Sequence, residues 1–272
     1  MTTTIYDFLG HLDAIIPFAL AEDWDNCGLQ AGHPDGSVTR VMVSLDVTMD
    51  VMDAALKWGA DLVLTHHPLM IKPLAQLNFG TMPGSAIAMA AMHHISIISL
   101  HTNLDKVQGG LNDRFASMLG LGELSCLQSP CDKIMPADCL EGLGRVGKLP
   151  RPMTLEALGK QVKAVFTAPY VRIVGEPNMR VDTVAVCTGS GESLLKAFFC
   201  SGAQAYITGD MKYHGARDIE MSGVGGIDVG HFASEHIAID LLVEKVNALS
   251  NQSKLGLEVK GYIGESDPFI IK

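Results

Sequence analysis

The sequence predicts an α/β protein built from two related lobes, each with a mainly parallel sheet. One strand–helix–strand pattern occurs twice, apolar runs alternate with helical segments, and polar side chains follow several predicted strands. Strands that alternate with helices are typical of βαβ units, whose parallel sheets are covered on both faces. Because the repeat preserves ligand-type residues, we expect the two lobes to face each other across a cleft that holds one polar site.

The repeated pattern spans residues 38–65 and 181–208, which align without a gap at an offset of 143. Each copy contains a β-rich run, a helix ended by glycine, and a second buried run. Two generic strand–helix–strand units of similar composition are the alternative. A further match, at an offset of 130, favours a true repeat because it concerns ligand-type residues: His101 and Asp105 align with His231 and Glu235.

The first lobe is expected to contain the first copy and the segments around it. Residues 5–20 have the apolar periodicity of an amphipathic helix, which Pro17 breaks or ends. Short β-rich runs predict buried strands, and Gly59 is a typical helix stop. The expected order after the first helix is a strand over 40–45, a helix over 49–58, a strand over 61–65, a helix over 85–93 and a strand over 95–100.

The second half repeats this order after an irregular link. Residues 125–152 are rich in glycine, proline and cysteine, which predicts linkage or edge structure. We therefore place the first lobe at 1–125, completed by 230–272, and the second lobe at 126–229. The last residues, 261–272, are expected to return to the first lobe. The expected order is a helix over 155–166, a strand over 181–187, a helix over 193–200, a strand over 205–208, a helix over 216–221, a strand over 226–229 and a helix over 233–249.

Composition limits the classes of function. The chain has 272 residues, 47% of them hydrophobic and 18% charged, which is typical of a folded globular protein with a sizeable core. Its net charge of −10 disfavours a duplex nucleic-acid binder, which needs a basic surface. A small-molecule ligand, or a site whose metal ions supply positive charge, agrees better with this charge.

The sequence gives no sign of a targeting or membrane segment. Its first basic residue is Arg40, and no apolar run reaches the roughly 18 residues that a membrane helix needs. The six cysteines have no C-x-x-C spacing, which favours reduced thiols. We therefore expect a cytoplasmic protein without a membrane partner.

Ligand-type side chains follow three of the predicted strands. In parallel α/β sheets, ligands bind outside the carboxyl ends of the strands, so these side chains are expected to converge. A single histidine at a strand end is more often a hydrogen-bonded core or surface residue, but a set at corresponding strand ends favours a metal site. Mixed imidazole and carboxylate ligands suit Zn, Fe, Mn or Ni. The candidates are His66 and His67 after 61–65, His101 and Asp105 after 95–100, and His231 and Glu235 after 226–229.

Polar residues of the second copy leave alternatives open. Asp210 either holds an imidazole N–H or caps the following turn. Lys212 and His214 either contact an anionic substrate or are solvated loop residues. The Gly-Ser-Gly turn at 189–191 is either a tight strand-to-helix connection, which we favour, or a cradle of backbone N–H groups for a phosphate.

Six short motifs are spread along the chain: Trp24-Asp25-Asn26-Cys27-Gly28-Leu29, Thr65-His66-His67-Pro68, His101-Thr102-Asn103-Leu104-Asp105, Thr208-Gly209-Asp210-Met211-Lys212-Tyr213-His214, Gly230-His231 with Glu235, and Asp267-Pro268-Phe269. In this combination the sequence resembles the YbgI family, also called the Nif-three-like or dinuclear metal centre family, with members named GTP cyclohydrolase 1 type 2 homologues. The length resembles the short form of that family.

The resemblance implies a two-lobed α/β fold, two divalent metal ions per chain and a toroidal homohexamer. All five ligand positions carry the residue type expected in the family. His101 also lies on a matching motif, and we expect it to act as a catalytic proton shuttle if it binds no metal. The implied metal ligands are His66, His67, Asp105, His231 and Glu235.

The resulting hypothesis is a dinuclear-metal-dependent hydrolase that acts on a nucleotide or a related small molecule. A GTP cyclohydrolase-like ring opening is one such reaction. Two metal ions would activate water for attack on an electrophilic carbon or phosphorus. The alternatives are a non-catalytic protein for metal delivery or storage, and an oligomeric scaffold that the metals brace.

Overall fold

The chain divides into two compact units, each made from two separate segments. The computed structural model describes residues 3–128 and 141–272. Each unit contains one copy of the repeat and is described by itself. The first unit comprises Met1–Leu104 and Ala238–Ser266, and the second comprises Asp105–Ile237 and Asp267–Lys272.

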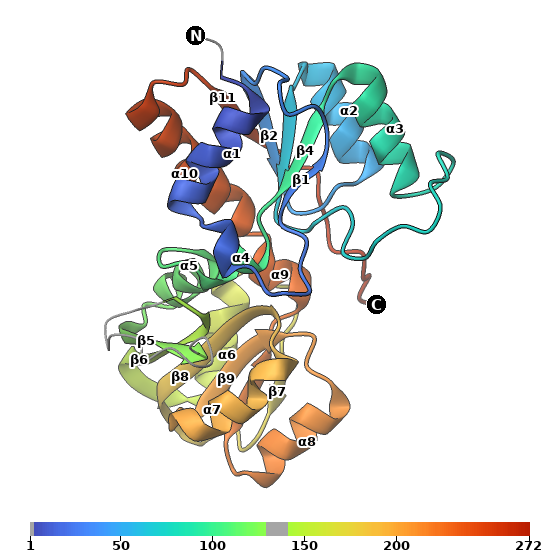
Figure 1. Ribbon diagram of the computed structural model, residues 1–272. Helices are drawn as coiled ribbons and strands as arrows, with labels where there is room; N and C mark the ends of the chain where they lie inside the picture. The colour runs from blue at the N-terminus through green and yellow to red at the C-terminus, as the bar shows by residue number, and fades with distance from the viewer. Residues whose placement is uncertain (1–2, 129–140) are drawn as a thin grey trace. The chain divides into compact units, whose positions relative to one another are not determined.

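The first unit is a mainly parallel sheet with helices on both faces, as the sequence predicts (Figure 1). Strands β11, β2, β3 and β4 are parallel, and the edge strand β1 is antiparallel to β4. Helices α2 (Met49–Trp58) and α3 (Gly84–His93) cover one face, and α1 (Ile5–Ile15) and α10 (Ala238–Ser253) cover the other. The strand order is β1 (Gly28–Ala31), β4 (Ser96–Ser99), β3 (Leu62–Thr65), β2 (Arg40–Ser44) and β11 (Glu258–Gly261).

Local sequence explains where these helices begin and end. Thr4 caps α1 in a capping box with Asp7, and α1 ends before Pro17. Thr48 accepts a hydrogen bond from the backbone N–H of Val51 at the start of α2. The helix ends at Gly59, whose φ of 73° is the left-handed conformation that glycine adopts without strain.

The second unit has a mixed sheet, with more antiparallel pairing than the sequence predicts. Strands β8, β9 and β10 are parallel, whereas β5, β6 and β7 join by antiparallel pairing. Of the two alternatives predicted for 125–152, irregular linkage or edge structure, the described residues support the second, because they belong largely to the edge strand β5 and its antiparallel neighbour β6. Its Pro150 lies within β6, at the irregularity between Lys148 and Met153. The strand order is β5 (Gly122–Gln128), β6 (Leu143–Thr154), β8 (Arg180–Ser190), β9 (Ala205–Gly209), β10 (Gly225–Asp228) and β7 (Arg172–Val174).

Helices cover both faces of the second sheet as well. Alternate side chains of β8 face opposite cores, since Val184 and Val186 pack with Phe115 of α5 (Leu111–Met118). On the other face, Ala185 packs with Phe198 of α7 (Leu195–Ser201). Helix α6 (Leu155–Val165) lies with α5, and α8 (Tyr213–Met221) lies with α7. No helix of the described residues combines the length and apolar character needed to cross a membrane.

The repeat is visible in the strand register. Val41 pairs with Leu62 in the first unit, and Val184 pairs with Ala205 in the second, so the offset of 143 is kept on both strands. The antiparallel edge strands β1 and β7 also correspond, since β1 pairs with β4 and β7 pairs with β10. The duplicated design therefore covers four strands, which are β1, β4, β3 and β2 in one unit and β7, β10, β9 and β8 in the other.

Two helices explain why these units differ from the lobes expected at 1–125 with 230–272 and at 126–229. Helix α5 follows the first copy but packs on β6 and β8 in the second unit. Helix α10 follows the second copy but packs on β2 and β11 in the first. Because β2 and β8 are equivalent strands, each unit is completed by a helix from the other half of the chain. Periodicity identifies an apolar helix face but not the sheet that covers it.

Candidate metal centre

Three imidazoles lie together in the first unit, at the carboxyl ends of two neighbouring parallel strands. His66 and His67 follow β3, and His101 follows β4 one residue beyond Leu100. The ring centroids are 5.1 Å apart for His66 and His67, 5.2 Å for His66 and His101, and 5.7 Å for His67 and His101. One nitrogen from each ring lies within 4.8 Å of the other two, a spacing at which three imidazoles can share a cation.

Each of these rings is oriented by an oxygen that accepts from Nδ1. The acceptor is the Leu100 carbonyl for His66 at 2.9 Å, Asp46 for His67 at 2.8 Å, and Asp25 for His101 at 2.9 Å. Carbonyl and carboxylate oxygens only accept, so a neutral ring carries its proton on Nδ1 and leaves the Nε2 lone pair for a metal. This is the usual way in which proteins orient metal-binding histidines, and the residues therefore fit a bound metal ion.

Asp25 is a buried carboxylate at the centre of a hydrogen-bond network. Its second oxygen accepts from the Thr102 backbone N–H at 3.0 Å and from the Thr102 hydroxyl. Burial alone would raise the pKa of Asp25, but hydrogen bonds from His101 and Thr102 outweigh it and hold that pKa well below its usual range. Burial, more than the nearby Asp25 charge, raises the pKa of Cys27 to about 12.

Sequence reasoning missed Asp25 and Asp46 as positioning residues. Asp46 follows the carboxyl end of β2, a third strand end, and this position could have identified it as a candidate from the sequence. Asp25 is separated from His101 by 76 residues, and only its motif Trp24-Asp25-Asn26-Cys27 singles it out. Glu265 steadies the Asp46 loop by accepting from the backbone N–H groups of Leu45 and Asp46, each at 2.9 Å.

The second unit holds the carboxylate candidates and one imidazole. In α9 (His231–Glu235), His231 Nε2 lies 2.8 Å from Glu235 and Nδ1 lies 2.7 Å from Asp210. Burial alone would lower the pKa of His231, but Glu235 and Asp210 outweigh it and raise the pKa to about 9. Of the two roles that the sequence left open for Asp210, the structure therefore supports the one that holds an imidazole N–H.

Asp105, at the end of α4 (Thr102–Lys106), and Glu235 are both buried carboxylates of the second unit, with exposed fractions of 9% and 4%. Burial, followed by the charges of Asp105 and Glu235, raises the pKa of the Cys187 thiol well above its usual range, so both carboxylates act on one small region. Carboxylates in a buried environment need compensating positive charge. A divalent cation is a chemically suitable source of it.

Two glycines make room for Glu235 and His231. A Cβ on Gly189 would lie 2.0 Å from Glu235 Oε1, and a Cβ on Gly209 would lie 2.8 Å from the His231 backbone nitrogen. The Gly189 N–H donates to Ser234 at 2.9 Å, and the Gly191 N–H donates to Thr208 at 3.0 Å. These amides are therefore used within the fold, which supports a tight connection at 189–191 rather than a phosphate cradle.

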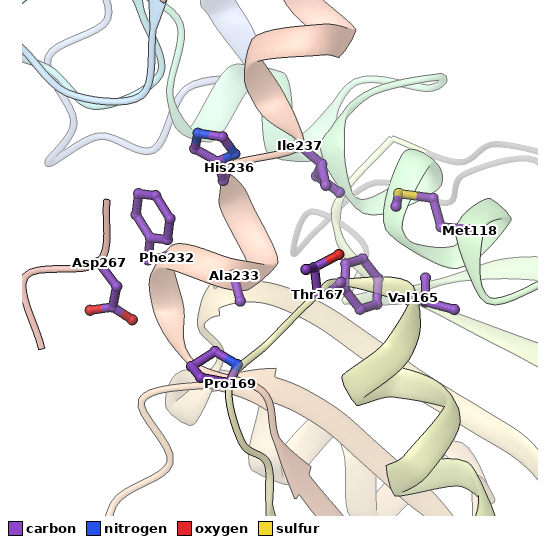
Figure 2. Close-up of a pocket in the computed structure, with 10 residues that line it drawn as sticks. Met118, Val165, Thr167, Pro169, Phe232, Ala233, His236, Ile237 and Asp267 are labelled. Carbon is purple, nitrogen blue, oxygen red and sulfur yellow. The ribbon is translucent and has the colours of Figure 1, made fainter. Parts of the chain in front are cut away.

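A pocket of about 380 Å³ is lined by Phe232 and Ala233 of α9 and by His236, which follows it (Figure 2). His231 and Glu235 share one helix face because they are four residues apart. The pocket uses the residues between and after them, so it is separate from the candidate ligands. Its lining is mainly apolar and comprises Met118, Val165, Phe166, Thr167, Pro169, Phe232, Ala233, His236, Ile237 and Asp267.

Comparison with known proteins decides the family. A model of the Duf34/NIF3 (NGG1p interacting factor 3) family matches residues 3–268. The chain belongs to this family. A relative from Clostridium acetobutylicum, named GTP cyclohydrolase 1 type 2 homolog, is 31% identical over 100% of both chains. A Streptococcus pneumoniae relative of the same name is 35% identical over 92% of this chain and 90% of its own.

A solved structure agrees with the family and the fold. A hypothetical protein of Staphylococcus aureus is similar to this chain with a TM-score of 0.93 at 29% identity, over 100% of both chains. The resemblance expected from the sequence motifs and the predicted α/β class with two sheets are therefore confirmed. Of the sequence-predicted site residues, the structure brings His66, His67 and His101 together in the first unit, and His231 and Glu235 together in the second. Their assignment as ligands remains a prediction.

Proposed function

We propose that this NIF3 family protein is a metal-dependent hydrolase that binds two divalent metal ions per chain. The observation that carries the proposal is the set of three imidazoles at the ends of β3 and β4, each with Nδ1 held by an oxygen acceptor. Such pre-orientation is costly to maintain in a purely structural cluster and is common around metals. Mixed imidazole and carboxylate donors suit Zn, Fe, Mn or Ni.

The proposed ligands come from both units. His66 and His67 belong to the first, and Asp105, His231 and Glu235 belong to the second. When bound, the metal ions would supply Lewis-acid activation of water. Asp46 would keep the His67 ring in place, and Asp210 would do the same for His231.

His101 is the proposed proton-transfer residue. Its Nδ1 is held by the Asp25 carboxylate at 2.9 Å, and its ring lies among the other two imidazoles. A carboxylate behind an imidazole stabilises the protonated ring, so the Asp25–His101 pair can take up a proton and return it to a leaving group. If His101 Nε2 instead bound an ion, Asp25 would orient a metal ligand. The metal content of a His101→Ala variant distinguishes a proton-transfer residue from a metal ligand.

The proposed substrate is a nucleotide or a related small molecule. The name of the relatives supports testing a GTP cyclohydrolase-like ring opening first. Lys212 and His214 are exposed at the start of α8 and are the proposed contacts for a phosphate group. A homohexamer and a cytoplasmic location complete the proposal. The free thiols of Cys27, Cys187 and Cys200 among the described residues fit a reducing compartment.

Metal content and turnover test the proposal together. Protein purified without chelator or affinity metal should carry about two transition-metal equivalents per chain by elemental analysis. The protein should then hydrolyse GTP or another member of a nucleotide panel. His101→Ala should lower turnover by roughly 10²–10⁴-fold with both equivalents retained if His101 transfers protons. Full metal content without turnover on any substrate would favour a metal carrier or a braced scaffold, and absence of metal would refute the proposal.

A further inference from the structure

The backbone around Asp105 is held at nearly every residue by other parts of the second unit. These contacts come from α5, which follows it, and from the start of β6. The Asp105 carbonyl accepts from Asn112 Nδ2 at 3.1 Å, the Lys106 carbonyl from the Gly142 N–H at 2.9 Å, the Val107 carbonyl from Arg145 Nη2 at 3.4 Å, and the Gly109 N–H donates to Asp113 at 2.6 Å.

Arg145 is the centre of this arrangement. Its side chain is fully buried, with an exposed fraction of 0%. A guanidinium has five N–H donors, and here all five are used. Nε and Nη2 donate to the two oxygens of Asp113 at 2.5 and 2.9 Å, Nη1 donates to the carbonyls of Gly142 and Gly144 at 2.7 and 2.8 Å, and Nη2 donates to Val107. A side chain with every donor satisfied has one orientation.

Glycine is required at both residues that bring carbonyls to Arg145. A Cβ on Gly142, where φ is 144°, would lie 2.3 Å from the Gln128 carbonyl oxygen. A Cβ on Gly144, where φ is 66°, would lie 2.8 Å from the Val186 carbonyl oxygen. The sequence Gly142-Leu143-Gly144-Arg145 therefore encodes this contact, although its composition alone predicts irregular structure.

Asn112 extends the arrangement toward the other carboxylate. Its side chain is fully buried, donates to the Asp105 carbonyl and accepts from the Thr188 N–H at 3.0 Å. Thr188 precedes Gly189, the glycine against which Glu235 lies. One amide side chain thus links the backbone of Asp105 to the backbone that receives Glu235.

We propose that Arg145, Asp113 and Asn112 form a positioning hub that fixes Asp105 and thereby sets the affinity of the protein for metal ions. The proposal rests on the proposed function, because it requires Asp105 to be a ligand. A buried ion pair adds little net stability over an apolar replacement. A geometric role is therefore the better explanation for the Arg145–Asp113 pair, in which every guanidinium donor is used. Arg145, Asp113 and Asn112 act through Asp105 and need not touch the metal.

A double-mutant cycle on the metal-free protein tests the hub, with Zn²⁺ affinity measured by competition with a chelator. Arg145→Lys keeps the charge but offers three donors and no planar fork, so it should weaken Zn²⁺ binding by roughly 10–100-fold. In the Asp105→Ala background the same change should have an effect of less than about 3-fold, since it acts through the missing carboxylate. Phe115→Leu, on α5 but in the apolar core, is the matched control for lost stability and should leave the affinity unchanged.

The outcomes separate the hub from the proposed function. Unchanged affinity in Arg145→Lys, or losses that add fully in the double variant, would overturn the hub. If Arg145→Lys does not fold, Asp113→Asn takes its place in the same cycle with the same expectation, because Asp113 accepts hydrogen bonds from Arg145 and from the Gly109 N–H. If Asp105→Ala by itself leaves Zn²⁺ affinity unchanged, the ligand role of Asp105 fails, and the proposed function fails with it.

Discussion

The two copies of the repeat share a strand scaffold but differ in the residues directly after their equivalent threonines. Thr65 of the first copy precedes His66 and His67, whereas Thr208 of the second precedes Gly209 and Asp210. Both threonine hydroxyls donate to a backbone carbonyl, that of Thr65 to His67 at 2.7 Å and that of Thr208 to Gly189 at 3.2 Å, and the Thr208 hydroxyl also accepts from the Gly191 N–H at 3.0 Å. The scaffold can thus be duplicated while the chemistry at the strand ends diverges.

The difference gives the proposed tasks of the two units a complementary form. The proposed ligands of the first unit are imidazoles, and a carboxylate orients His67 just as another orients the neighbouring His101. The proposed ligands of the second unit are two carboxylates and one imidazole, with glycines that leave room for them. Loss of the adjacent imidazoles of the first unit should therefore remove metal outright, whereas changes at the glycines of the second unit should act through crowding.

The largest expected effect comes from removing the adjacent imidazoles of the first unit. The double variant His66→Ala/His67→Ala should lose at least one transition-metal equivalent per chain and all turnover, because no other donor replaces two ligands. Elemental analysis and the nucleotide assay measure this. The matched control is His93→Ala/His94→Ala, an exposed adjacent pair at the end of α3, which should keep full metal content. Equal metal loss in both double variants would break the comparison.

In the second unit, Gly189→Ala should act by crowding. The new Cβ would meet Glu235 Oε1 at 2.0 Å, so the carboxylate must move. We expect at least a tenfold loss of Zn²⁺ affinity in chelator competition, in line with other disturbed metal surroundings. Gly202→Ala is the control, because Gly202 has a φ of 77° but open space at its Cβ, so it carries the backbone strain without the collision. Similar Zn²⁺ affinities in the two variants would show that Glu235 is not a ligand.

Removal of an orienting carboxylate should have an intermediate effect. Asp46→Ala deletes the acceptor of His67 Nδ1 and should lower Zn²⁺ affinity by roughly 10–100-fold, with the fold retained. Asp53→Ala, at an exposed position of α2, is the matched control. Unchanged affinity in Asp46→Ala would mean that the His67 ring is held well enough by packing alone.

The smallest expected effect is on the stability of the strand scaffold that the two copies share. Asp61 accepts from the backbone N–H groups of Thr39 and Arg40, and Gln204, its equivalent, accepts from those of Asp182 and Thr183. Asp61→Ala should lower the free energy of unfolding by about 1.5–3 kcal/mol and Gln204→Ala by about 0.5–1.5 kcal/mol, because a charged acceptor makes the stronger bonds. Urea unfolding measures both. A larger loss of stability in Gln204→Ala than in Asp61→Ala would show that the charge of the acceptor does not decide its contribution.

Local pattern was sufficient to predict much of this molecule. Buried runs such as 40–45 and 61–65 lie in strands, Gly59 ends a helix as predicted, and the histidines after β3 and β4 lie together because parallel neighbours end at one edge. The features that the sequence did not predict depend on long-range contacts. The pairing of Asp25 with His101, the partner sheet of α5 and the hairpin of β5 and β6 have no periodic signal, since each is decided by residues distant in sequence.

The reciprocal placement of α5 and α10 affects how the chain can fold during its synthesis. While the protein is being synthesised, one face of the first sheet lacks α10, one of its two covering helices, until residues 238–253 have left the ribosome. A ribosome adds about 5–20 residues per second, so this part of the surface stays open for about 8–30 seconds after β2 to β4 have been made. A truncated chain that ends near residue 104 therefore exposes an apolar face, and no cut between the copies releases two complete folding modules.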